Sequence, residues 1–179
     1  MSTAFRPIVL QVTGGDCHEQ FKLDALAFPK RGFMPNRIPL HRVLKATPEN
    51  VYQAFVDADA TCKWLPPNGF TGKIHGLDAK VGGSFKMSFT NFGTGQSHSF
   101  GGEYLELVPG ERLRYTDGFD DRNMPGEIMV TVTLKKVLCG AEINIVQAGL
   151  PDAIPPEMCY LGWQESLTLL AKLAEAEIT

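Results

Sequence analysis

The stretch GGSFKMSFTN (residues 82–91) alternates apolar and polar side chains directly after a pair of glycines. Successive side chains of a β-strand point to opposite faces, so every second residue of this stretch shares a face. One of these faces carries Phe85, Met87, Phe89 and Asn91. A face this apolar has to pack against another element, and the stretch therefore predicts a strand of a sheet with one buried side.

The sequence on both sides of this stretch continues the pattern. We expect strands at residues 37–46, 72–79, 83–91, 98–108, 112–119, 127–137 and 141–147, because Gly and Pro separate the apolar runs at the spacing of an antiparallel sheet. The same alternation gives the later strands one apolar face each. These faces carry Leu113, Tyr115, Asp117 and Phe119, then Ile128, Val130, Val132 and Leu134, then Ile143, Ile145 and Gln147.

Two short helices are expected after the first strand. Thr47, Pro48 and Glu49 form a start signal, because threonine caps free backbone N–H groups, proline fits the first turn and an acidic residue interacts well with the helix dipole. A second helix is expected at residues 58–64, where Pro66 and Pro67 then prevent its continuation.

The period changes from strand to helix after Pro156. A long helix is expected at residues 157–176, with an apolar stripe along one side. The stripe consists of Tyr160, Trp163, Leu167, Leu170 and Ala174. A sheet with one apolar face packs stably on such a helix. We therefore predict an α+β, helix-grip fold, in which a curved antiparallel sheet of about seven strands wraps around the long C-terminal helix.

A curled sheet over one helix leaves a hollow, and the side chains that face it are the candidate ligand-binding residues. They are Trp64, Phe85, Met87, Phe89, Asn91, His98, Leu113, Tyr115, Asp117, Val130, Val132, Ile145, Gln147, Trp163 and Leu167. For each of them the alternative interpretation is that the side chain simply fills the core.

Four polar residues stand among these apolar positions, namely Asn91, His98, Asp117 and Gln147. A buried polar group costs roughly 1 to 3 kcal/mol unless it is paired. These residues therefore either orient a carbonyl or hydroxyl of a ligand, or lie near strand ends and bond to loops or water. His98 is also a candidate general base, a role that needs a partner and a substrate proton within hydrogen-bond reach.

The segment WLPPNGF (residues 64–70) joins the second helix to the next strand. A tryptophan beside two prolines and Phe70 resembles a rigid hydrophobic lid that gates the hollow or contacts a protein. The alternative is that Trp64 fills one end of the space between the sheet and the long helix, while the prolines stiffen the connection.

Composition and motifs exclude several classes of function. The chain has 179 residues and a net charge of −3 without a basic block, which argues against nucleic acid as a partner. The four His and four Cys residues are widely spaced, so we expect no metal site and no cofactor. No apolar run reaches the roughly 20 residues that cross a bilayer, so no membrane insertion is expected. Residues 1–10 carry no signal-peptide pattern, and a cytoplasmic location is expected.

Five short motifs together resemble a known family. They are Ala46-Thr47-Pro48-Glu49, Trp64-Leu65-Pro66-Pro67, Val81-Gly82-Gly83-Ser84-Phe85, Tyr104-Leu105-Glu106-Leu107-Val108-Pro109 and Gly162-Trp163. This ordered set is similar to the START-like, or SRPBCC, superfamily, and within it to the activator of heat-shock-protein ATPase homologue-like (AHSA-type) group. The resemblance covers residues 34–175 and implies a helix-grip domain that encloses an apolar cavity. We expect this domain at residues 34–179 and an irregular extension at residues 1–33.

The resemblance leaves three functions open, because a fold shared so widely does not name one. The first is binding of a small hydrophobic ligand in the cavity, without catalysis. The second is a protein-interaction module that regulates a chaperone ATPase, and self-association is a related possibility. The third is a cavity enzyme of cyclase or hydrolase type, which requires His98, Tyr115 and Asp117 to converge. An open cavity lined by these three favours the enzyme, whereas a tightly filled grip favours docking.

Overall fold

The computed structural model describes residues 37–122, 125–152 and 154–175. The predicted extension at residues 1–33 lies outside these described residues. The elements are β1 (Arg37–Leu44), α1 (Pro48–Val56), α2 (Ala58–Trp64), β2 (Phe70–Leu77), β3 (Ser84–Asn91), β4 (Ser97–Val108), β5 (Arg112–Phe119), β6 (Ile128–Val137), β7 (Gly140–Ala148) and α3 (Pro156–Ala174).

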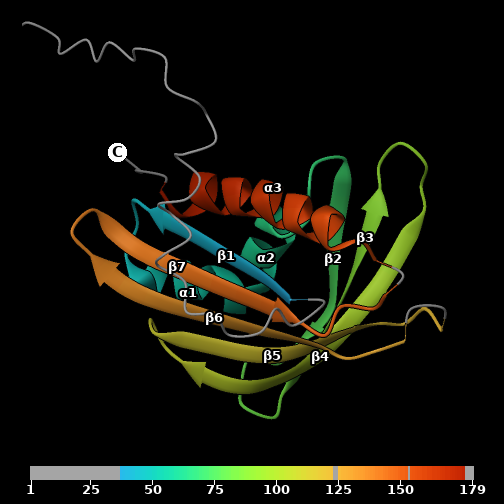
Figure 1. Ribbon diagram of the computed structural model, residues 1–179, viewed down its shortest axis with the longest axis horizontal. Helices are drawn as coiled ribbons and strands as arrows, with labels where there is room; N and C mark the ends of the chain where they lie inside the picture. Colours follow the sequence, from blue (N-terminus) through green and yellow to red (C-terminus); the bar gives the residue numbers. More distant parts are fainter. Residues whose placement is uncertain (1–36, 123–124, 153, 176–179) are drawn as a thin grey trace, which may run out of the picture. The chain divides into compact units, whose positions relative to one another are not determined.

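The seven strands form one sheet in the order β1-β7-β6-β5-β4-β3-β2, and every neighbouring pair is antiparallel. Figure 1 shows this sheet curving around the side of α3, with β2 and β3 at the end of the molecule where α3 begins. The predicted helix-grip α+β fold is confirmed.

Local chemistry fixes where the short helices begin. The Thr47 hydroxyl accepts a hydrogen bond from the backbone N–H of Asn50 at 3.2 Å, and Pro48 occupies the first turn of α1. Asp57 caps α2 in the same way, because its carboxylate accepts from the N–H of Ala60 at 2.7 Å. Both caps satisfy backbone donors that have no partner within the helix.

The core lies on the inner face of the sheet and follows its cross-strand pairs. Leu113 pairs with Val132, Val132 with Ile145, and Ile145 with Leu40, which forms one row across four strands. All four side chains are buried. The register therefore brings the predicted inward faces of these strands into one continuous apolar layer.

The helices cover only part of this inner face. α3 packs near β1, α1 near β6 and β7, and α2 near β2. Within the described residues, no helix packs with comparable closeness on β3, β4 or β5. The middle of the curved sheet therefore faces a region that no helix fills. None of the described helices is both long and apolar enough to cross a membrane.

The buried side of α3 differs from the predicted stripe at its N-terminal end. Leu167 and Leu170 are buried as expected, but Trp163 is only half-buried and Tyr160 is exposed. Cys159, one residue before Tyr160, faces the interior instead. The inward side of the first turns is therefore rotated relative to the side that carries Leu167.

Two leucines of α3 provide a matched test of this packing. Leu167 is 1% exposed and Leu161 is 58% exposed. We expect Leu167→Ala to lower the free energy of unfolding by about 2 to 5 kcal/mol, because it leaves a cavity in the core. Leu161→Ala is expected to change it by less than about 0.5 kcal/mol. Urea denaturation measures both, and equal effects would contradict the orientation of α3.

Candidate functional site

An apolar cavity of about 560 Å³ lies between the sheet and the first half of α3, and it opens to solvent. Strands β3, β4 and β5, the strands without a closely packed helix, each contribute three residues to its wall. These are Phe85, Met87, Phe89, His98, Phe100, Tyr104, Tyr115, Asp117 and Phe119. The volume is in the range of natural small-molecule sites.

Aromatic rings in edge-on or tilted contact form this wall. The ring of Phe85 lies 5.6 Å from those of both Tyr104 and Tyr115, and Phe89 meets Phe100 at 4.8 Å. Phe100 in turn contacts Phe119 at 6.3 Å. Such contacts stabilise one another and hold the rings in place. The cavity thus has a fixed apolar surface.

Two tryptophans close one end of the cavity. The Trp64 indole N–H donates to the carbonyl of Ala54 at 2.8 Å, and its ring packs edge-on against Phe55 at 4.7 Å. Trp64 is almost fully buried and lies 6.5 Å from the ring of Trp163. This burial fits the interpretation of Trp64 as a plug rather than a lid.

Several polar side chains of the cavity wall have hydrogen-bond partners within the protein. The Thr61 hydroxyl donates to the carbonyls of Asp57 and Ala54, and the Ser166 hydroxyl to those of Leu65 and Gly162. The Trp163 indole N–H donates to Oε1 of Gln147 at 2.8 Å.

Asp117 differs from these groups, because its Oδ1 atom is buried and makes no hydrogen bond. Burial raises the pKa of Asp117 from 3.8 to about 7, although the backbone N–H of Gly118 partly opposes this shift. Burial also raises the pKa of Tyr104 to about 12 and that of Cys159 above its ordinary value. The pKa of Tyr115 is raised by burial and by the nearby Asp117.

The described residues contain no group of three or more His, Cys, Asp or Glu side chains that could hold a metal ion. The cavity wall likewise carries no Lys or Arg. Among the described residues, the cavity is therefore an apolar container with one carboxyl group, whose Oδ1 atom makes no hydrogen bond.

Comparisons with known proteins agree with this architecture. Residues 45–175 match the model of the family described as "Activator of Hsp90 ATPase homolog 1-like protein". The chain belongs to this family. No curated protein matches the sequence.

Solved structures of similar proteins support the same assignment. Protein CV1439 from Chromobacterium violaceum is 61% identical, with a TM-score of 0.80 over 80% of this chain and 100% of that chain. A protein from Rhodobacter sphaeroides is 22% identical, with a TM-score of 0.68 over 77% of this chain and 91% of its own. Protein NE0264 from Nitrosomonas europaea is 19% identical, with a TM-score of 0.66 over 78% of this chain and 94% of its own. The last two share the fold alone.

Nine of the fifteen predicted site residues line the cavity of this family member. They are Trp64, Phe85, Met87, Phe89, His98, Tyr115, Asp117, Gln147 and Trp163. His98 is exposed at the rim, where it also borders a smaller hollow of about 310 Å³ near Asp120. Whether any of these residues contacts a ligand stays a prediction.

The other six predicted residues do not line the cavity. They are Asn91, Leu113, Val130, Val132, Ile145 and Leu167. The five apolar ones are buried in the hydrophobic core. Asn91 forms a turn instead, because its Oδ1 accepts from the backbone N–H groups of Gly93 and Thr94. This matches the alternative of a polar residue at a strand end.

Sequence reasoning missed other parts of the wall, among them Phe100, Tyr104, Ile74, Cys159, Gly162 and Ser166. Phe100 and Tyr104 are four residues apart in β4, so strand alternation places them on one face and would have found them. Cys159, Gly162 and Ser166 lie at helical spacing, but on a side of α3 that hydrophobicity alone does not mark.

The pKa of Asp117 makes a prediction about stability. A carboxyl group with a raised pKa in the folded state binds a proton that the unfolded chain releases between about pH 4 and pH 7, so its contribution to stability falls as the pH rises through this range. We expect Asp117→Asn to be more stable than the wild type at about pH 8, by roughly 1 to 3 kcal/mol, and similar to it at about pH 4.

Thermal or urea denaturation across this pH range measures the difference. Asp120→Asn is the control, because it removes a carboxylate from an exposed ion pair with Lys86 on the surface. That variant should follow the pH dependence of the wild type. If the stability of the wild type and of both variants depended on pH in the same way, this would contradict the raised pKa of Asp117.

Proposed function

We propose that this protein binds a small hydrophobic ligand in the cavity between the sheet and α3. The observation that carries the proposal is the cavity of about 560 Å³, which has an aromatic wall and which the side chains of the described residues leave open. Interiors of proteins are normally packed as densely as organic crystals, so an apolar space of this size is exceptional unless something occupies it. An apolar ligand would leave water and gain contacts with the wall on entering.

A cavity enzyme is a second candidate, because His98, Tyr115 and Asp117 all line the same open cavity. This convergence is what such an enzyme requires. Within the described part of the chain, however, no hydrogen bond joins any two of these side chains, and general acid–base catalysis needs hydrogen-bond contacts to a substrate. Mass spectrometry of a bound ligand before and after incubation would distinguish turnover from binding.

Regulation of a chaperone ATPase is supported only by the description of the family. An open cavity does not favour this function, because a domain that docks onto another protein by its surface works equally well when side chains fill its interior.

Gly162 offers a clean way to close the cavity. It lines the cavity within α3, and a Cβ atom built there meets no atom within 4 Å. Phenylalanine at this position would occupy free space without displacing the backbone. It would also favour the helix, because glycine is about 0.5 to 1 kcal/mol less favourable than other residues inside a helix.

We expect Gly162→Phe to weaken binding of N-phenylnaphthylamine, an uncharged fluorescent probe, by at least about tenfold, which corresponds to about 1.4 kcal/mol. Leu161→Phe is the matched control, because it adds the same ring one residue away on the exposed side of α3. Fluorescence titration should give saturable binding with unchanged affinity for the control. Unsaturable binding, or equal affinity in both variants, would contradict the proposed function.

A further inference from the structure

The unpaired Oδ1 atom of Asp117 has no explanation in the packing of the described residues. Its Oδ1 atom is inaccessible to solvent, has no hydrogen-bond donor and belongs to a residue that lines the cavity. Buried polar groups are nearly always paired, so an orphan of this kind calls for a specific reason. Asp117 takes part in none of the ion pairs among the described residues whose partners are His41–Glu142, Lys80–Asp78, Lys86–Asp120 and Arg112–Glu106.

Among the described residues, no group supplies the missing partner. The titratable residues that line the cavity are His98 and Tyr104 on β4, Tyr115 and Asp117 on β5, and Cys159 on α3. None of them is a permanent cation, and His98 lies exposed at the rim. Thr61 and Ser166 donate to backbone carbonyls, and Oε1 of Gln147 accepts from Trp163, so none of these groups donates to Oδ1. A ligand can supply the donor that Oδ1 lacks.

We propose that the ligand carries a protonated amine on an apolar body and that Asp117 binds this amine inside the cavity. This inference rests on the proposed function, because it specifies the chemical class of the hydrophobic ligand. Because Oδ1 is closed to solvent in this structure, the Asp117 side chain would turn toward the amine. The amine would then donate to the carboxylate in a charge-assisted hydrogen bond, which is stronger than a bond between neutral groups.

The surroundings of Asp117 fit a cation. Tyr115 and Phe119 lie two residues before and after it on the same face of β5, and all three line the cavity. Aromatic rings attract a cation through their negatively charged faces, most strongly where water is excluded. A carboxylic acid as ligand is disfavoured, since the ionised Asp117 would repel its negative charge and no lining Lys or Arg would offset this.

The test compares two probes of nearly equal shape. Naphthylethylamine carries a cation at neutral pH, and naphthylethanol carries a neutral hydroxyl in the same place. Isothermal titration calorimetry at about pH 8, where Asp117 is mostly ionised, would measure both with the wild type, Asp117→Asn and Asp120→Asn. The two variants remove the same charge, but only the first removes it from the cavity.

We expect the wild type and Asp120→Asn to bind the amine at least about tenfold more tightly than the alcohol. Asp117→Asn should lose this preference and bind the two probes with about equal affinity. Equal affinity of the wild type for both probes would overturn the role of Asp117 but leave hydrophobic binding intact. Failure of both probes to bind would overturn the proposed function as well.

A measurement on the wild type alone tests the proposal even if Asp117→Asn fails to fold. Lowering the pH from about 8 to about 5.5 protonates Asp117 but leaves the amine charged. Affinity for the amine should then fall about tenfold or more, whereas affinity for the alcohol should stay constant. Parallel pH dependence of the two probes would contradict the proposal, because it would show that Asp117 does not select the amine.

Discussion

Seven strands spaced about 4.8 Å apart span roughly 29 Å, whereas one helix with its side chains is only about 10 to 12 Å wide. α3 alone cannot cover the apolar face of such a sheet. Curvature reduces the mismatch, and α1 and α2 cover further parts near β6, β7 and β2. The inner faces of β3, β4 and β5 remain beyond the reach of close helix packing, and the cavity lies there.

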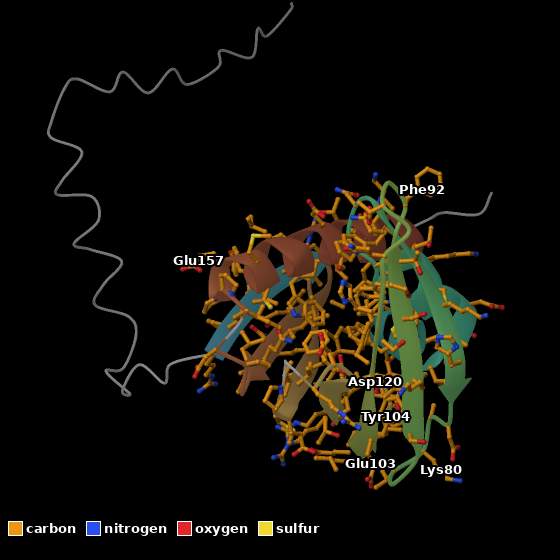
Figure 2. All side chains as sticks on the ribbon, turned by 90° about the vertical axis from the view of Figure 1, so that its right-hand side faces the viewer. Lys80, Phe92, Glu103, Tyr104, Asp120 and Glu157 are labelled. Atoms are coloured by element: carbon orange, nitrogen blue, oxygen red, sulfur yellow. The ribbon has the colours of Figure 1, made fainter. Side chains whose placement is uncertain are left out.

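The residues around the cavity keep this space open. The large rings of the wall contact one another. Phe85, for example, cannot move into the cavity without losing its contacts with Tyr104 and Tyr115. Trp64 is fixed at the closed end by its hydrogen bond to Ala54 and its contact with Phe55. In Figure 2, Phe92 lies at the outer tip of the hairpin between β3 and β4, well away from Tyr104 near the other end of β4.

Much of the fold could be predicted from the sequence, because its signals are local. Strand alternation in GGSFKMSFTN and the cap at Thr47 depend on neighbouring residues only, and the structure has every predicted element with small shifts of its ends. The cavity depends on which strands the helices cover, which no local pattern encodes. Val132 and Tyr115 both face inward, yet only Tyr115 lines the cavity. Asn91 follows the alternation of its strand, but its side chain bonds to the turn after the strand instead of lining the cavity.

The central claim is that an apolar ligand enters this cavity rather than the surface, and methyl NMR tests it most directly. Met87 and Met158 line the cavity, whereas Met129 lies between inward-facing neighbours of β6 and so points to the other face of the sheet. With methionine methyl groups labelled and N-phenylnaphthylamine bound, we predict nuclear Overhauser contacts from the probe to Met87 and Met158 but not to Met129. Contacts to Met129 alone, or none to Met87, would contradict this account.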